Sequence, residues 1–329
     1  MKVGVAVPGL MAFWVAPSIV ELGIEVGAVC GTPESIDRAR ELCEKCGTSA
    51  ENAYADYDLM LAEADIDTVY IALPNHLHYP FSLKAMVAGK NVVVEKPFAS
   101  NDREAAHLVE VARENGVYLW EAVSTPHQPG LAKIREWLPR IGRVKVVSCN
   151  YSQYSRRYDQ FRQGTVLPVF SPKAAGGAMM DLGLYNTHYL VGLFGEPNGV
   201  AYHANVEKDI DVSGVATYDY DGFQAVGICA KDCGSPSWTS VQGEDGYIYT
   251  DTPANLMTKV TLHLNDGTEE EFVDDCTTNW VYEWGLFLKD LESGSTDRCY
   301  KALDTTLAVA RTLTKARLSA GVRFPADEQ

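Results

Sequence analysis

The chain has 329 residues, of which 46% are hydrophobic, and its formal net charge is −16 at pH 7. This length and apolar content suffice for one large domain or two medium ones, each with its own core. The acidic balance excludes nucleic acid as an expected partner, because binding to phosphate requires a basic patch.

The first 122 residues alternate short apolar strands with helices. Strands are predicted at 3–7, 25–30, 68–73, 91–95 and 117–122, and helices at 12–22, 33–46, 57–63, 78–88 and 102–115. Asn101 is expected to cap the last of these helices and Gly116 to end it. Such alternation is typical of a parallel sheet with right-handed crossovers. Residues 1–122 are therefore predicted to form a doubly wound, nucleotide-binding Rossmann domain of the α/β class.

Residues 123–329 have a different pattern and are predicted to form an α+β domain. Alternating segments predict strands at 144–155, 199–207, 214–220, 223–230, 238–242, 247–250, 258–264 and 270–274. Tight turns between several of them indicate a mostly antiparallel sheet. Helices are predicted at 131–139, from near 176, at 281–292 and at 301–318. The last two helices, 281–292 and 301–318, are assigned to this domain, with packing against the first domain as the alternative.

Two features of the composition could suggest other classes of protein. No charged residue lies between Val3 and Val20, but the prolines within this run favour a buried strand, a turn and an apolar helix over a membrane span. Cys43 and Cys46 form a C-x-x-C pair, but the spacing does not repeat as a zinc site would require. We expect no metal, no membrane association and free thiols in a cytoplasmic protein.

The first strand leads into an altered dinucleotide fingerprint. The pattern G-x-G-x-x-G/A is represented by Val7-Pro8-Gly9-Leu10-Met11-Ala12. Val7 replaces the first glycine, whereas Gly9, which lets the backbone approach a pyrophosphate, is present. The helix N-terminus still offers N–H groups to phosphate, so we expect dinucleotide binding to survive.

Two further segments end strands of the first domain. LPNHLH occupies residues 73–78, and VVVEKP ends in Glu95-Lys96-Pro97. Ligands bind beyond the carboxyl ends of the strands in an open parallel sheet. Lys96 is placed there to hydrogen-bond a hydroxyl or carbonyl oxygen. The alternatives are a simple turn that caps a helix and a surface lysine.

A third segment, AAGGAMMDLGLYNTHYL, carries three candidates for acid–base chemistry on one predicted helix. Asp181 and Tyr185 are four residues apart, and Tyr185 and His188 are three apart, so all three share a face. The Gly176-Gly177 pair is expected to let the helix start pack close to another backbone. Tyr185 and His188 as ordinary core residues are the alternative.

Taken together, LPNHLH, AGKNVVVEKPFA, GGAMMDLGLYNTHYL and GEDGYI resemble the glucose–fructose oxidoreductase / inositol dehydrogenase / MocA family along nearly the whole chain. The resemblance implies a Rossmann domain followed by an α+β domain with a large, open, mostly antiparallel sheet. It also implies NAD(P)-dependent oxidation or reduction of a carbinol on a sugar, cyclitol or polyol. Tyr185 stands where many members of the family have a histidine. The branch that resembles dihydrodiol dehydrogenase has a tyrosine at this position, as this chain does.

The resemblance implies roles for individual residues. Tyr185 exchanges the hydroxyl proton, Lys96 lies near the nicotinamide and stabilises the phenolate, and Asp181 contacts substrate. His188 either relays the proton or is itself the acid–base residue, because a free histidine already titrates near pH ~6.5. Pro97 is expected to follow a cis or strained peptide bond. The predicted cofactor contacts are Gly9, Leu10, Met11, Gly31, Thr32, Leu73, Pro74, Asn75, His78, Glu95, Lys96 and Pro97.

The identity of the cofactor and of the substrate stays open at this point. The second strand ends Cys30-Gly31-Thr32 with no acid to hold the ribose of NAD, and Arg38 and Arg40 follow, so NADP is slightly favoured over NAD. Tyr154, Arg157 and Tyr158 are candidates for substrate binding, or belong to a solvated turn.

These residues lead to three hypotheses for the function and one for the assembly. The leading hypothesis for the function is a dehydrogenase or reductase acting on a small hydroxylated substrate. A non-catalytic dinucleotide-binding sensor and a glycoside-cleaving member of the family are the alternatives. A broad open sheet predicts a homodimer or homotetramer.

Overall fold

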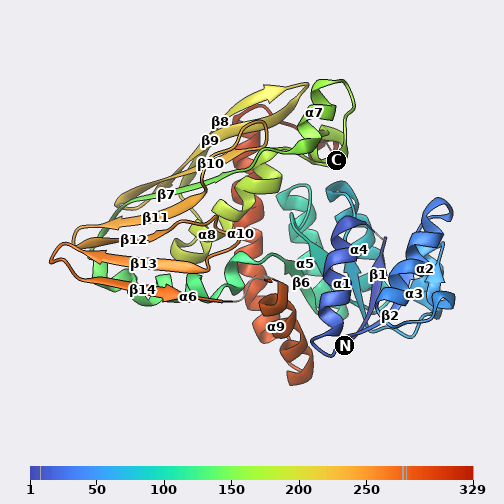
Figure 1. The fold of residues 1–329 in the computed structure, drawn as a ribbon. Coiled ribbons are helices and arrows are strands. Elements are labelled where there is room, and N and C mark those ends of the chain that lie inside the picture. The colour runs from blue at the N-terminus through green and yellow to red at the C-terminus, as the bar shows by residue number, and fades with distance from the viewer. Residues whose placement is uncertain (8, 276–277, 279, 329) are drawn as a thin grey trace. The chain divides into compact units, whose positions relative to one another are not determined.

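The computed structural model describes residues 1–7, 9–275, 278 and 280–328. The chain divides into two compact units, each built around its own sheet (Figure 1). The first unit comprises Met1–Ala122 and Trp280–Asp304, and the second comprises Val123–Asn279 and Thr305–Gln329. Residues 280–304 thus group with the Rossmann unit, which is the arrangement that the sequence had left open.

The first unit is a six-stranded sheet in the order β3-β2-β1-β4-β5-β6, with every pairing parallel. Its strands are β1 (Lys2–Ala6), β2 (Glu25–Cys30), β3 (Ala53–Tyr54), β4 (Thr68–Ile71), β5 (Asn91–Glu95) and β6 (Leu119–Ala122). The helices between them are α1 (Leu10–Val20), α2 (Ile36–Lys45), α3 (Tyr57–Glu63), α4 (His78–Val87) and α5 (Asp102–Asn115). Strands covered on both faces are apolar throughout, which is why continuous apolar runs in the sequence identify the strands of this unit.

The predicted strands and helices of the first unit are confirmed. The structure adds strand β3, whose two residues are too few to form a recognisable pattern in the sequence. The Asn101 side chain accepts a hydrogen bond from the Glu104 N–H at 2.9 Å, and Gly116 ends α5 in the left-handed region at φ +63°. Both the start and the end of α5 therefore follow from local chemistry.

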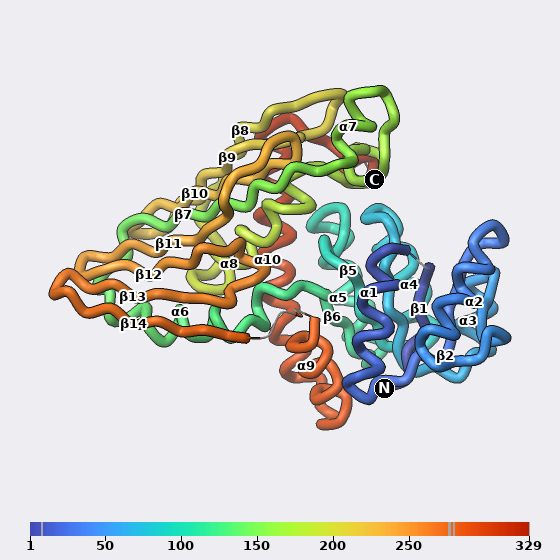
Figure 2. The backbone as a smooth tube through the Cα atoms, in the orientation of Figure 1, coloured from blue at the N-terminus to red at the C-terminus, as the bar shows by residue number. Residues whose placement is uncertain are grey.

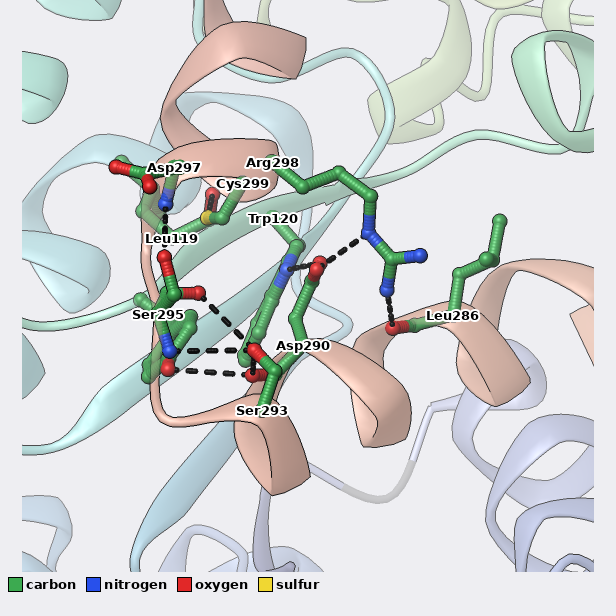
Figure 3. Close-up of polar contacts among 10 residues, drawn as sticks. Leu119, Trp120, Leu286, Asp290, Ser293, Ser295, Asp297, Arg298 and Cys299 are labelled. Carbon is green, nitrogen blue, oxygen red and sulfur yellow. Dashed lines mark hydrogen bonds and ion pairs between the residues drawn. The ribbon is translucent and has the colours of Figure 1, made fainter.

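Helix α9 (Trp280–Ser293) and the start of α10 (Asp297–Ser319) are attached to the edge strand β6 (Figure 3). The buried carboxylate of Asp290 accepts hydrogen bonds from Trp120 Nε1 at 3.0 Å and from Arg298. Cys299 Sγ donates to the Leu119 carbonyl at 3.1 Å. These bonds explain why residues from the end of the chain belong to the first unit.

The second unit is an eight-stranded sheet in the order β14-β13-β12-β11-β7-β10-β9-β8. Its strands are β7 (Val144–Ser152), β8 (Gly199–Glu207), β9 (Ile210–Tyr220), β10 (Phe223–Ala230), β11 (Trp238–Gly243), β12 (Gly246–Thr250), β13 (Lys259–Leu264) and β14 (Glu269–Val273). Only the β7–β10 pairing is parallel, so the predicted, mostly antiparallel sheet is confirmed; Figure 2 follows the chain through it.

The helices of this unit are α6 (Pro129–Trp137), α7 (Arg156–Arg162), α8 (Leu184–Phe194) and the second part of α10. Helix α7 lies beyond the strand predicted at 144–155, in a segment for which the sequence pattern predicts no element. The strand ends at Ser152, and the Ser155 N–H then donates to the Lys231 carbonyl at 2.9 Å.

The two faces of the large sheet differ in their cover. Helices α6 and α8 pack on one face, where Val147, Cys149 and Val241 are fully buried (Figure 1). The opposite face, called the open face below, carries Tyr247 and Tyr249, which are 42% and 36% exposed. No helix within the described ranges is long and apolar enough to cross a membrane.

Candidate active site

Val7 follows β1 at the position where the dinucleotide fingerprint has its first glycine. Val7 adopts φ +70°, in the left-handed region that glycine enters without steric cost. Its N–H donates to the Cys30 carbonyl at 2.8 Å, and the Gly9 N–H donates to the Val7 carbonyl at 2.8 Å. A β-branched residue in this conformation is strained, so the turn is held by its surroundings.

The N-terminus of α1 suits an anionic group. Gly9 is the N-cap residue in extended conformation; no side chain caps the helix, and its first turn, Leu10 and Met11 included, holds no acid. A Cβ on Gly9 would lie 3.3 Å from the Ala72 carbonyl, so the glycine allows the helix to start close to the loop after β4. Uncapped N–H groups with a close backbone approach are what a pyrophosphate needs.

The end of β2 presents hydroxyl groups where a ribose-binding acid would stand. The Gly31 N–H donates to the Tyr54 carbonyl at 2.7 Å, and a Cβ on Gly31 would lie 3.0 Å from Ser35 Oγ. The Thr32 N–H donates to Ser35 Oγ at 2.8 Å. This tight turn leaves Thr32 exposed at the start of α2.

The two arginines of α2 are placed differently. The Arg40 guanidinium donates to Asp37 at 2.8 Å. The exposed Arg38 guanidinium instead lies 5.3 Å from the ring centre of Phe13, a residue of α1. Of the two cations, Arg38 is therefore the one directed toward the dinucleotide-binding helix.

His78 joins two of the segments predicted to contact the cofactor. Its fully buried ring has Nδ1 at 2.7 Å from the Pro97 carbonyl and Nε2 at 2.8 Å from the Leu73 carbonyl. Burial lowers the pKa of His78 more than these carbonyls raise it, so the ring is neutral and donates to one carbonyl at a time. His78 thus ties the loop after β4, with Pro74 and Asn75, to the turn after β5.

The turn after β5 separates two side chains that were predicted together. Lys96 is half-buried at the carboxyl end of the strand, and the Lys96–Pro97 peptide bond is cis, as expected. Glu95 is buried, and its Oε1 accepts a hydrogen bond from Tyr70 at 2.6 Å. Burial raises the pKa of Glu95. The Glu95 carboxyl is therefore committed to the interior of the first unit.

A second buried acid faces Glu95 from α9. Burial, together with the nearby charges of Glu95 and Glu121, raises the pKa of Glu283 well above its usual value. The Oε2 atom of Glu283 has no hydrogen-bond partner within the described part of the chain. The neutral form of the Glu283 carboxyl is therefore favoured over its charged form.

The Gly176-Gly177 pair starts the helical segment of the second unit. A Cβ on Gly176 would lie 2.5 Å from the Pro168 carbonyl oxygen, which confirms the expected close backbone approach. Gly177 has φ +106°, and a Cβ there would overlap Asp211 Oδ1. The buried Asp211 carboxyl accepts a hydrogen bond from the Met179 N–H at 2.6 Å. Asp211 of β9 therefore caps the helix from a distant strand.

The helix itself is not the regular α-helix that the sequence predicted. Residues Met179–Gly183 form a π-helical turn, and α8 begins only at Leu184. Asp181 lies in this turn and forms an ion pair with Lys231, the residue directly after β10. Wide turns of this kind are frequent at functional sites, and the sequence pattern does not reveal them.

Tyr185 and His188 differ in exposure. Tyr185 is half-buried, and its ring centre lies 5.7 Å from that of Tyr151 on β7. His188 is only 2% exposed, inside the core of the second unit. Tyr185 is therefore the more accessible of the two candidates for proton transfer.

The substrate-binding candidates after β7 are not equally available. Tyr158 is buried on α7, and its hydroxyl donates to Glu207 at 2.6 Å. The exposed Tyr154 hydroxyl donates to Asp159 at 2.6 Å. Arg157 is exposed. Tyr158 is thus engaged in packing, whereas Tyr154 and Arg157 lie at the surface.

Sequence reasoning missed three residues next to the predicted ones, namely Lys231, Asp211 and Tyr151. Each lies on or beside a strand that is distant along the chain from Asp181 and Tyr185. An alternating strand pattern identifies which face a residue occupies but not its partner on another element. For Asp211, the sequence offers one indication of a special role: a charged residue within an otherwise apolar strand segment, IDVSGV.

Comparison with known proteins places both units. The model of an oxidoreductase family with a NAD-binding Rossmann fold matches residues 22–123, and that of the GFO/IDH/MocA C-terminal domain matches residues 132–249. The chain is 35% identical over 296 residues to the scyllo-inositol 2-dehydrogenase (NADP(+)) IolU of Bacillus subtilis, covering 89% of each protein.

Two further comparisons agree with this placement. The chain is 27% identical to the trans-1,2-dihydrobenzene-1,2-diol dehydrogenase of Danio rerio over 88% of each protein. Among solved structures, it superposes with a TM-score of 0.82 and 24% identity on a 3-ketoreductase from Actinomadura kijaniata in complex with NADP and TDP-benzene, over 97% of each chain. At this identity the structural match shows the shared fold.

Proposed function

Because the chain belongs to the glucose–fructose oxidoreductase / inositol dehydrogenase / MocA family of NAD(P)-dependent oxidoreductases, we propose that it transfers a hydride between NADP and a carbinol of a cyclitol, sugar or related polyol. The observation that carries this proposal is the match over 89% of both chains to a relative named as an NADP-dependent scyllo-inositol dehydrogenase. The candidate residues of both units supply the chemistry that such a reaction requires.

The arrangement at α1 and β2 supports NADP as the cofactor. The uncapped N-terminus of α1 at Gly9 would hold the pyrophosphate. Thr32 and Ser35 would offer hydroxyl groups, and Arg38 a guanidinium, to a 2′-phosphate. His78 would fix the two loops that border the nicotinamide.

The proposed reaction assigns one role to each catalytic residue. The dinucleotide, when bound, supplies the carbon that exchanges the hydride. Tyr185 exchanges the hydroxyl proton, and Lys96 donates a hydrogen bond to the reacting oxygen, which favours its anionic form. Asp181 accepts a hydrogen bond from a substrate hydroxyl and thereby orients the ring.

We favour Tyr185 over His188 as the proton-exchanging group because of their exposure. His188 is only 2% exposed, whereas Tyr185 is half-buried and therefore more accessible to a substrate. A free phenol titrates near pH ~10, so Tyr185 needs a neighbouring cation to act as a base near neutral pH. His188 then supports α8 from the core side.

The first test is a fluorescence titration of the purified protein with NADPH and NADH, after a check for carried-over cofactor. Saturable binding with a preference for NADPH is expected. Arg38→Ala should weaken NADPH binding about ten-fold and leave NADH binding unchanged, because a charge-assisted contact contributes about 1.5 kcal/mol. Arg40→Ala is the matched control, since that guanidinium already pairs with Asp37.

The second test is turnover. NADP⁺ reduction is measured with scyllo-inositol, other cyclitols, D-xylose and D-glucose, with Lys96→Ala and Tyr185→Phe as inactive controls. Binding of NADPH without turnover of any carbinol would favour the sensor reading. Absence of binding to a folded protein would mean that the strained Val7 turn excludes the dinucleotide.

We further propose that the protein assembles as a homodimer or homotetramer through the open face of the large sheet. Tyr247 and Tyr249 of β12 are exposed there, and on the same face Val146 of β7 and Val215 of β9 are 41% and 38% exposed. A second copy of the same surface would cover this apolar area. Light scattering should give at least twice the chain mass of 36.1 kDa, and Tyr249→Lys should lower it. A cytoplasmic location stays a prediction.

A further inference from the structure

Lys231 is a buried cation at the end of a strand that otherwise packs in the core. Its side chain is 7% exposed, and its ammonium group forms an ion pair with Asp181 Oδ2, whose side chain is 27% exposed. A buried ammonium is stable only when it is paired. The carboxylate of Asp181 therefore lies between a buried cation and the surface of the second unit.

The backbone and surroundings of Lys231 fix the position of its ammonium group. The Lys231 N–H donates to the Val212 carbonyl at 2.9 Å, and the Lys231 carbonyl accepts from the Ser155 N–H at 2.9 Å. The ammonium lies 5.7 Å from the ring centre of the fully buried Phe170. Three different segments therefore hold Lys231 in place, independently of the helix that carries Asp181.

We propose that Lys231 is a positioning residue that keeps Asp181 ionised and holds it as the hydroxyl-accepting carboxylate of the second unit. The proposal rests on the proposed function for its substrate, a neutral polyhydroxylated compound. An ionised carboxylate accepts hydrogen bonds and cannot donate one. Asp181 therefore orients a substrate hydroxyl and does not supply the proton, a role that remains with Tyr185.

The ion pair also bears on the class of substrate. Asp181 and Lys231 together carry no net charge, so the Asp181 carboxylate needs no cation from the ligand. A carboxylate in such a pair accepts hydrogen bonds from hydroxyl groups. A neutral cyclitol or sugar fits this surface better than an amino sugar, whose ammonium would compete with Lys231.

The test measures the protonation of Asp181 directly. Full-length protein labelled with ¹³C at the aspartate side-chain carboxyl carbon is titrated by NMR, and the Asp181 signal is assigned from the Asp181→Asn variant. In the wild type this signal is expected to stay at the ionised shift down to the lowest pH at which the protein is folded. Lys231→Met should raise its midpoint by about one pH unit or more, and Lys231→Arg should restore the wild-type behaviour.

Kinetics on the substrate found by the turnover screen provide the functional readout. Lys231→Met should lower kcat/KM at least ten-fold while the Kd for NADPH changes less than two-fold. An unchanged Asp181 midpoint, or an unchanged kcat/KM, in Lys231→Met would overturn the proposal. If the wild type turns over no carbinol, the proposed function fails, and the NMR midpoint still decides whether Lys231 sets the charge of Asp181.

A second variant covers the case in which Lys231→Met does not fold. The double variant Lys231→Met/Asp181→Asn removes both charges and should recover most of the lost thermal stability. A double variant as unstable as Lys231→Met alone would show that Lys231 serves packing only, and would refute its pairing role.

Discussion

The start of the helix that carries Asp181 depends on the absence of a side chain at Gly177. This glycine has φ +106°, and a Cβ would overlap the Oδ1 atom of Asp211. Gly177→Ala therefore has two separate effects. It places an L-residue in the left-handed region, and it pushes away the carboxyl group that accepts hydrogen bonds from the Met179 N–H at 2.6 Å and the Tyr202 hydroxyl at 3.0 Å.

The two effects can be given magnitudes. An alanine in the left-handed region costs about 1–2 kcal/mol. Loss of two hydrogen bonds to a buried carboxyl group costs about 1–1.5 kcal/mol each. Gly177→Ala should therefore lower the free energy of unfolding by about 4 kcal/mol, of which about 2–3 kcal/mol comes from the Asp211 contact.

Gly164→Ala is the matched control. Gly164 has φ +101°, close to that of Gly177, but a Cβ there would meet nothing within 4 Å. Urea unfolding followed by circular dichroism should show a loss of only about 1–2 kcal/mol for this variant. Equal losses for the two variants would refute the assignment to Asp211. Gly177→Ala should also reduce turnover, because Asp181 and Tyr185 follow on the same helical segment, whereas Gly164→Ala should not.

Three further predictions concern the first unit. The stability of Glu283→Gln relative to the wild type should rise by at least about 1 kcal/mol between pH 5 and pH 8. The pKa of Glu283 is raised in the folded state, so the stability of the wild type falls as the pH rises from the unfolded pKa toward the folded one. Urea unfolding of both proteins at pH 5 and pH 8 measures this. A difference in unfolding free energy between variant and wild type that did not grow with pH would contradict the prediction. His78→Phe keeps a buried ring but removes both contacts between the loops, and fluorescence titration should show a Kd for NADPH raised about ten-fold, with His107→Phe at the surface as the control. Val7→Gly relieves the positive φ and should tighten NADPH binding and raise Tm; weaker binding would show that the Val7 side chain, not its backbone, shapes the turn.

Much of the fold follows from local patterns. Continuous apolar runs such as Val92–Val94 and the caps at Asn101 and Gly116 determine the strands and helices of the first unit without reference to the rest of the chain. The same holds for the large sheet, where alternation and tight turns predict all eight strands. Strand β7 ends three residues earlier than predicted, at Ser152, and β9 begins four residues earlier than predicted, at Ile210. The place of Lys96 also follows, because the carboxyl end of a parallel strand has a known location in the sheet.

The sequence by itself therefore determined the two kinds of sheet, the family and the residue types of the candidate site. Only the tertiary structure decided the partners of those residues. Asp211 caps the Met179 N–H from 32 positions away, and Lys231 pairs with Asp181 across 50 positions. These contacts depend on the register of β9 and β10 beside the helix, which arises when the sheet packs. Hydrophobic periodicity is a property of neighbours along the chain, whereas the ion pair of Asp181 depends on neighbours in space.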